Sequence, residues 1–186
     1  QQLYSDEVSE NLAHIALAKL EAEFDGNLLV ITQNVDDLHE RAGSRRLLHM
    51  HGELSKGRCP KSLQTFILRE PFGPDNCCTC CIPAMRLRPH IVWFGEMPFG
   101  MDRIHDALDH CDLFIAIGTS GTVYPAAGFV DSANHHGAQT VEVNLVAPDR
   151  HSQFQYHFTG RAGDIVPQLV DDILNGRTLG SEPIAS

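Results

Sequence analysis

The chain has 186 residues, and its 24 acidic residues against 14 Lys and Arg give a formal net charge of -10. Such a charge repels nucleic-acid phosphates and anionic lipid headgroups, so we expect neither nucleic acid nor a membrane as a partner. With 42% hydrophobic and 20% charged residues, the composition is that of a globular protein, of a length that suits one domain or one domain with a small insert. No apolar run approaches the roughly 20 residues of a membrane-spanning helix.

The N-terminal part of the chain alternates between predicted helices and strands. Apolar residues at helical spacing predict a helix over 9–23, and the apolar run 28–32 is typical of a parallel strand buried on both faces. A short helix over 37–41 and a strand over 47–50 are predicted next. The chain opens without an initiator Met or a leader, so we expect that further residues precede it in the natural protein.

Residues 53–89 are different in character, being rich in Cys, Pro, Gly and polar residues with weak periodicity. Such a segment is predicted to be a small insert that a metal stabilises. Cys59 stands alone, and Cys78 and Cys81 form a C-x-x-C pair later in the segment. Two such pairs at this spacing are typical of structural zinc, so Cys59, Cys78 and Cys81 are the predicted ligands.

The fourth zinc ligand is left open by the sequence. Ser62 occupies the position of the second cysteine of the first pair, and either Cys77 or Cys80 could complete a tetrahedron. A vestigial site and a set of reactive free thiols are the alternatives. Cys111, beside an apolar strand, is predicted to be a packing residue.

Beyond residue 90 the alternation of strands and helices resumes. Strands are predicted over 91–94, 113–117 and 140–145, and helices over 101–110, from after Pro125 to 136, and over 164–174. Strands separated by helices predict an α/β fold with a parallel sheet.

Polar residues follow three of the predicted strands, over 33–36, over 118–121 and at Asn144. Ligands bind at the carboxyl ends of strands in open α/β sheets, and small residues such as Gly118 let backbone N–H groups approach an anion. A tight turn is the structural alternative for the glycine pair. Neither a G-x-G-x-x-G nor a P-loop motif occurs, which argues against an ordinary dehydrogenase and a P-loop NTPase.

His49 and His51 end the second predicted strand on the same face. A histidine at a strand terminus, followed by Gly52, suits a general base, although a hydrogen-bonded core histidine or a metal ligand is the alternative. Core or rim positions are predicted for Met85, Trp93, Phe94 and Met97. The alternative is that residues 92–96 form an edge that pairs with an extended peptide.

Taken together, these segments resemble the sirtuins, which are NAD-dependent protein-lysine deacylases, and look most similar to the bacterial CobB type. The resemblance runs from about Asn11 to Leu174. It is carried by the segments Thr32-Gln33-Asn34-Val35-Asp36-Asp37-Leu38-His39-Glu40-Arg41-Ala42-Gly43, His49-Met50-His51-Gly52-Glu53-Leu54, Arg88-Pro89-His90-Ile91-Val92-Trp93-Phe94-Gly95-Glu96, Gly118-Thr119-Ser120, Tyr124-Pro125-Ala126-Ala127-Gly128 and Asn144-Leu145.

The resemblance implies a Rossmann-like domain, over 1–52 and 90–186, with a small zinc-binding insert over 53–89. It implies that NAD is consumed as a co-substrate, with nicotinamide and O-acyl-ADP-ribose as products, and that His51 removes a ribose hydroxyl proton. The implied cofactor-binding residues are Gln33, Asn34, Val35, Asp36, Gly118, Thr119, Ser120, Asn144, Leu145, Val146 and Ala162. The implied substrate-binding residues are Val92, Trp93, Phe94, Gly95 and Glu96.

The family's Gly-Ala-Gly-x-Ser loop and its acyl-reading Tyr-x-x-Arg pair are expected to lie upstream of this chain, so acetyl and succinyl preference stay open. The family resemblance and the thiol-rich zinc motif imply a cytoplasmic location and acyl-lysine proteins as partners. The alternative function is a non-catalytic, zinc-stabilised module that binds ADP-ribose or acylated peptides. A nucleic-acid-binding zinc ribbon is a third possibility, which the acidic charge opposes.

Overall fold

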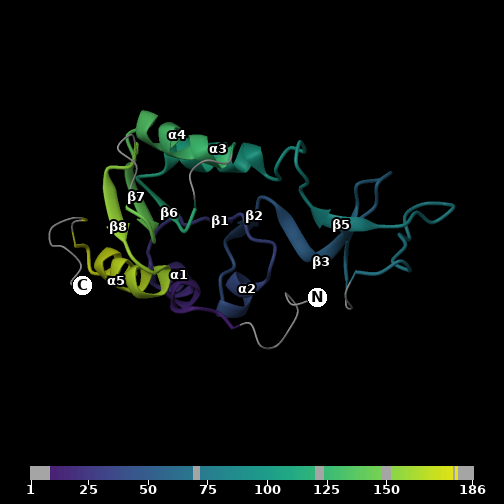
Figure 1. Cartoon of the computed structure of the whole chain (residues 1–186), viewed down its shortest axis with the longest axis horizontal. Coiled ribbons are helices and arrows are strands. Elements are labelled where there is room, and N and C mark those ends of the chain that lie inside the picture. Colours follow the sequence, from purple (N-terminus) through teal and green to yellow (C-terminus); the bar gives the residue numbers. More distant parts are fainter. Residues whose placement is uncertain (1–8, 69–71, 120–123, 148–151, 178, 180–186) are drawn as a thin grey trace.

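The computed structural model describes residues 9–68, 72–119, 124–147, 152–177 and 179 (Figure 1). Helices lie on both sides of a set of parallel strands, and an antiparallel extension projects from one end (Figure 1). The helices and strands are α1 (Leu12–Glu23), β1 (Val30–Thr32), α2 (Leu38–Ala42), β2 (Leu47–His49), β3 (Gly52–Arg58), β4 (Thr65–Ile67), β5 (Arg88–Ile91), α3 (Met101–His110), β6 (Leu113–Ile117), a 3-10 turn (Ala126–Gly128), α4 (Phe129–His135), β7 (Gln139–Asn144), β8 (Tyr156–Thr159) and α5 (Ala162–Leu174).

The parallel strands form two ladders. β1 pairs with β2, with Thr32 opposite His49, and β6, β7 and β8 pair in that order. All of these pairs are parallel, which confirms the α/β prediction. β8 is not among the predicted strands because its short Tyr-His-Phe-Thr run mixes polar and aromatic residues, and its identity as a strand depends on pairing with β7.

Two apolar cores cover the two faces of the parallel strands. On one face α1 and α5 pack against β7, with Leu20, Val141 and Leu169 among the buried residues. On the other face α3 and α4 bury Ile104 and Phe129 against residues of the β2 region. Figure 1 shows these helix pairs on opposite sides of the strands. Strands buried on both faces explain the apolar runs of the sequence.

Helix α1 begins later than the spacing predicts. The Asn11 side chain accepts hydrogen bonds from the backbone N–H groups of Ala13 and His14, and His14 Nδ1 accepts from the Asn11 backbone in return. This reciprocal cap starts the helix at Leu12, so the predicted start at residue 9 is wrong by about one turn. The short helix α2 ends as predicted at Gly43, whose φ of 110° is left-handed.

The predicted strand over 91–94 is wrong. β5 ends at Ile91 and pairs antiparallel with β3, so it belongs to the β4-β3-β5 sheet of the projecting extension and not to the parallel strands. Residues from Val92 onward leave the sheet as a turn. The apolar run 91–94 predicts a strand by its residue types alone. The pattern does not show which strand it pairs with, and the pairing with β3 ends at Ile91.

Gly52 joins β2 to β3 where the chain has no room for a side chain. A Cβ at this position would collide with the backbone oxygen of His90, and φ is +86°. We expect Gly52→Ala to lower the free energy of unfolding by about 3 kcal/mol or more, because a backbone atom must move. Chemical denaturation measures this.

Gly137→Ala is the matched control, since Gly137 has the same φ of +86° and no atom lies within 4 Å of the place that a Cβ would take. It should cost only the strain of the left-handed conformation, about 1 kcal/mol. Equal losses for the two variants would contradict the steric argument.

Candidate functional site

The ends of β1, β6 and β7 lie together, as parallel strands require. Gln33 Nε2 donates to Thr119 Oγ1 at 3.3 Å, and Asn144 Nδ2 donates to the Thr119 carbonyl oxygen at 2.9 Å. Gly118, in a left-handed conformation with φ +62°, donates its backbone N–H to the Val143 carbonyl. The structure thus brings polar groups from three predicted strand exits to one edge.

A cavity of about 570 Å³ opens at this edge. Four of the predicted cofactor-binding residues line it, namely Gly118, Asn144, Leu145 and Ala162. Thr119 and Gln33 adjoin it through the hydrogen bonds to Asn144 and to each other. Asn34, Val35, Asp36 and Val146 do not line this cavity, and Ser120 lies outside the described residues.

The cavity also has a wall of which the sequence analysis named only Ala162. Residues 160–164, at the start of α5, and Glu10, Asn11 and Leu12, at the start of α1, line it. The signal for the first group is the small-residue run Gly160-Arg161-Ala162-Gly163, which directly follows β8. This run can be interpreted as a strand exit only once β8 is recognised as a strand.

The strand-exit segment 33–36 is held beside the two histidines. His51 Nδ1 lies 3.1 Å from the Gln33 carbonyl oxygen, and the Leu54 backbone N–H donates to the Val35 carbonyl. Because a carbonyl only accepts, Nδ1 carries the proton in this contact, and the neutral ring keeps a lone pair on Nε2. The Gln33 carbonyl therefore fixes the tautomer of His51 and leaves Nε2 as the ring atom that can accept a proton.

His49 is occupied on both ring nitrogens. Nδ1 lies 3.3 Å from the Asn34 carbonyl oxygen and Nε2 lies 2.8 Å from Glu40 Oε1, and its side chain is 8% exposed. It links α2 to the end of β2. Both histidines thus face the segment 33–36, as the sequence predicts, and they differ in the partner of Nε2.

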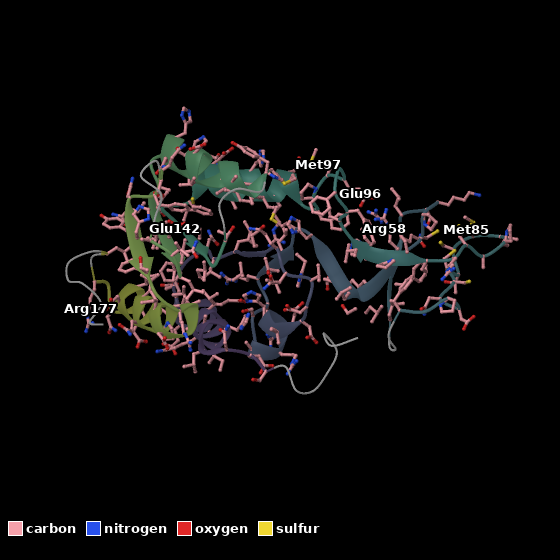
Figure 2. The ribbon with its side chains drawn as sticks, in the orientation of Figure 1. Arg58, Met85, Glu96, Met97, Glu142 and Arg177 are labelled. Atoms are coloured by element: carbon pink, nitrogen blue, oxygen red, sulfur yellow. The ribbon has the colours of Figure 1, made fainter. Side chains whose placement is uncertain are left out.

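Residues 92–96, the predicted peptide-binding segment, form an exposed turn next to His51. The Val92 backbone N–H donates to the His51 carbonyl at 2.9 Å. The Trp93 and Phe94 side chains point to solvent, at 54% and 107% exposure. Glu96 lies between the extension and the helices beside Met97, as labelled in Figure 2. Its carboxylate faces Arg88 at 2.6 Å, and this guanidinium lowers the pKa of Glu96 to about 2.

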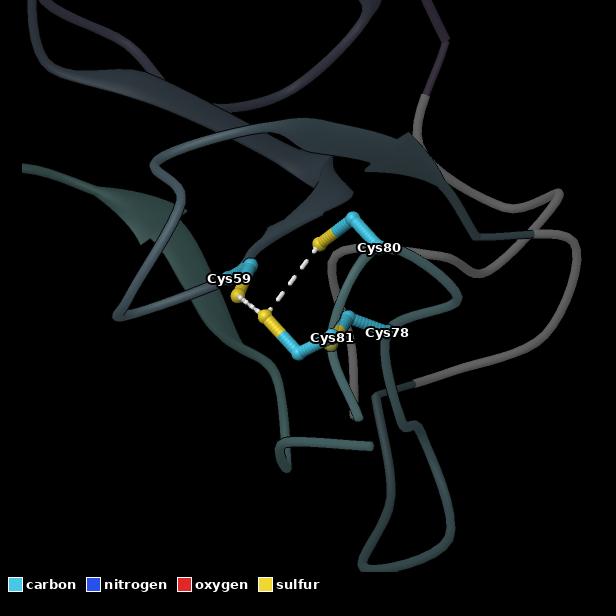
Figure 3. A group of neighbouring side chains, drawn as sticks. All are labelled: Cys59, Cys78, Cys80 and Cys81. Atoms are coloured by element: carbon cyan, nitrogen blue, oxygen red, sulfur yellow. Dashed lines mark hydrogen bonds between the residues drawn. The ribbon is translucent and has the colours of Figure 1, made fainter. Parts of the chain in front are cut away.

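Four thiols converge in the extension (Figure 3). The Sγ atoms of Cys59, Cys78, Cys80 and Cys81 lie within 4.8 Å of one another. The Cys59–Cys81 and Cys80–Cys81 separations are 3.7 and 3.8 Å. Zn–S bonds of about 2.3 Å in a tetrahedron place sulfurs about 3.8 Å apart, so the cluster fits a structural zinc ion.

The structure places Cys80, and not Cys77, at the fourth corner of the cluster. Cys77 is exposed and forms an isolated bridge to Arg86. The Ser62 hydroxyl lies 3.0 Å from Cys80 Sγ, so the serine that departs from the zinc pattern lies at the rim of the cluster. Hydrogen bonds from Ser62 lower the pKa of Cys59 to about 6, which favours the thiolate that a metal binds, whereas burial raises the pKa of Cys81 to about 12.

Among the described residues, no helix is both long and apolar enough to cross a membrane. The six cysteines are all unpaired.

Comparison with known proteins gives consistent results. Residues 1–125 match the Sir2 family. An NAD-dependent protein deacylase of Shewanella oneidensis is 81% identical over 182 residues, which is 98% of this chain and 75% of the relative. The chain thus spans about three quarters of the length of that relative.

Solved structures show the same similarity. A Sir2 homologue in complex with NAD is 34% identical with a TM-score of 0.80, over 91% of this chain and 67% of that one. Sir2Af2 bound to a myristoylated histone peptide is 32% identical with a TM-score of 0.73, over 91% of this chain and 75% of that one. The family match, the sequence identity and the shared Rossmann-like fold show that this chain belongs to the Sir2 family.

Proposed function

We propose that this protein is an NAD-dependent protein-lysine deacylase that releases nicotinamide and O-acyl-ADP-ribose. The observation that carries the proposal is the position of His51. Its Nδ1 faces the backbone carbonyl of Gln33, and the side chain of Gln33 contacts Thr119 at the cavity. A candidate base is thereby joined to a nucleotide-sized cavity. The deacylase name of the 81% identical relative supports the same activity.

The cavity suits the adenosine and phosphate part of NAD. Small residues at Gly118, Gly160 and Ala162 leave space, and the Asn144 side chain is held in place by its bonds to Thr119 and to the Leu145 backbone. A cavity of about 570 Å³ is within the range of small-molecule sites. Support for NAD also comes from the Sir2 homologue solved with it.

The segment Gln33–Asp36 suits the nicotinamide and ribose part, because it lies between the cavity and His51. In this assignment the lone pair on His51 Nε2 accepts the proton of a ribose hydroxyl, and the acyl oxygen of the substrate replaces nicotinamide at the ribose carbon. The Gln33 carbonyl holds the imidazole in the tautomer that this step needs.

The exposed turn 92–96 suits an extended acyl-lysine peptide, since it starts at the backbone of His51 and offers apolar side chains. The myristoylated histone peptide in Sir2Af2 supports a protein substrate. Zinc would serve the fold and not the chemistry, because four cysteines complete its shell. The unpaired thiols support a cytoplasmic location.

The test is nicotinamide release by the intact protein, together with any residues that flank this chain in the cell. With NAD and an acetyl-lysine or succinyl-lysine peptide, we expect nicotinamide and O-acyl-ADP-ribose in equal amounts, detected by mass spectrometry. NAD binding by calorimetry without turnover of either peptide would support the non-catalytic alternative. Release of nicotinamide without an acyl peptide would point to a different acceptor.

A further inference from the structure

Two hydrogen bonds between Glu96 and Trp93 close the turn over residues 93–96. The Glu96 backbone N–H donates to the Trp93 carbonyl at 2.9 Å, and the Glu96 carboxylate Oε2 accepts from the Trp93 backbone N–H at 3.1 Å. Gly95 supplies the left-handed φ of +87° inside the turn, with no atom within 4 Å of where a Cβ would lie. Glu96 therefore determines the shape of the turn through its side chain as well as its backbone.

Arg88 connects this turn to the antiparallel sheet. Its guanidinium donates to both Glu96 carboxylate oxygens, at 2.6 and 2.9 Å, and also to the Ile91 carbonyl at 3.2 Å. The carboxylate of Glu96 thus accepts three hydrogen bonds, two of them in the bidentate geometry that arginine forms best. Arg88 is the first residue of β5, so the turn is tied back across the whole strand.

The same segment is anchored to the strand end that carries the candidate base. Val92 donates its backbone N–H to the His51 carbonyl, and Phe99 donates to the Met50 carbonyl, both at 2.9 Å. The loop between them leaves from and returns to the backbone around His51. The turn over 93–96 lies between these two anchored residues, and the contacts between Arg88 and Glu96 restrict its movement.

The side chains that the turn presents face solvent. Phe94 and Trp93 are 107% and 54% exposed, and Met97 is 75% exposed. Exposed aromatic side chains have no core contacts that fix them, so their positions depend on the backbone of the turn. When the turn moves, these side chains move with it. The carboxylate of Glu96, in contrast, is already used by Arg88 and Trp93.

We propose that Arg88 and Glu96 are positioning residues that hold the 93–96 turn in the shape on which the peptide substrate docks. The proposal rests on the proposed deacylase function and deepens it. Glu96 acts through the turn and not by direct contact with the substrate, which changes the role implied by the family resemblance. The ion pair preorganises the peptide site next to His51 and leaves the NAD cavity untouched.

Steady-state kinetics of Glu96→Gln in the intact protein test the kinetic consequence. The amide keeps the size of the side chain and removes its charge. We expect the KM for the acyl peptide to rise about tenfold, which corresponds to about 1.4 kcal/mol, while kcat and the KM for NAD change less than about twofold. Asp172→Asn, which breaks the exposed Arg177–Asp172 pair, is the matched control and should leave all three constants unchanged.

Fluorescence of Trp93 tests the positioning role without any turnover, because it is the single tryptophan of this chain. We expect lower anisotropy and stronger acrylamide quenching of Trp93 in Glu96→Gln than in the wild type. Thermal unfolding of each variant confirms that it is folded.

The outcomes separate the two proposals. An active wild type whose Glu96→Gln variant keeps its peptide KM and its Trp93 anisotropy would overturn the positioning role alone. A kcat that falls while the peptide KM stays constant would also overturn it, because Glu96 would then act in the chemical step. An inactive wild type with the expected change in Trp93 anisotropy would overturn the deacylase function and leave the fixed turn intact.

Discussion

Nicotinamide release by the His51→Ala variant is expected to fall by a factor of about 10² to 10⁴, the usual contribution of a positioned general base. His51 Nδ1 faces the Gln33 carbonyl oxygen at 3.1 Å, so the proton acceptor is Nε2, and alanine removes it. Since the cavity is lined by other residues, NAD affinity measured by calorimetry should change little. The expected result is a loss of kcat with binding retained.

His110→Ala is the control for this variant. His110 ends α3 just before β6 begins, so it lies at the opposite end of that strand from the exit at Gly118. Its side chain is 77% exposed, and its loss should leave the rate unchanged. His51→Ala with full nicotinamide release would contradict the assignment of the base. Loss of NAD binding in that variant would show that His51 holds the nucleotide, and the catalytic assignment would then be wrong.

Removal of zinc is expected to unfold the extension that contains β3 and β4 before the parallel strands. Cys59 and Cys78 are buried with Leu87, and the small core around them has few other apolar residues. Structural zinc contributes about 10 kcal/mol or more to the folding of comparable small sites, so a chelator removes the main stabilising contact. Hydrogen exchange should show loss of amide protection in residues 53–68 and 72–89 while β6 and β7 stay protected.

The adjacent cysteines offer a matched pair for the ligand assignment. Cys78→Ser should lower the zinc content measured by elemental analysis and lower the unfolding temperature of the extension. Cys77→Ser should change neither, because Cys77 is exposed and outside the cluster. Cys80→Ser should resemble Cys78→Ser. Full zinc content in Cys80→Ser, or equal loss of protection in β6 and β7 on chelation, would contradict the site as described.

Much of the site chemistry could be predicted from the sequence because its signals are local. Helix α3 and strand β6 have the predicted bounds, since an amphipathic pattern and an apolar run determine each of them without reference to distant residues. Residue type and spacing mark His49 and His51 as candidate bases without deciding between them, and the family resemblance points to His51. The C-x-x-C pair points to metal for the same reason.

The tertiary structure decided the features that depend on which segments meet. Cys80 takes the fourth corner of the cluster, although Cys77 fits the spacing equally well, because only the folded extension shows which thiol faces inward. β5 pairs with β3, and β8 is a strand because it pairs with β7. The cavity wall at Gly160–Asp164 depends in turn on β8.

The sequence by itself thus determined the fold class, the family resemblance and the residue types available for chemistry, because backbone preference and side-chain reactivity are properties of short segments. Only the tertiary structure decided that both ring nitrogens of His49 have partners, whereas Nε2 of His51 has none among the described residues, and that Glu96 binds Arg88. Hydrogen-bond partners are distant in the chain and are selected by packing, so no local pattern encodes them.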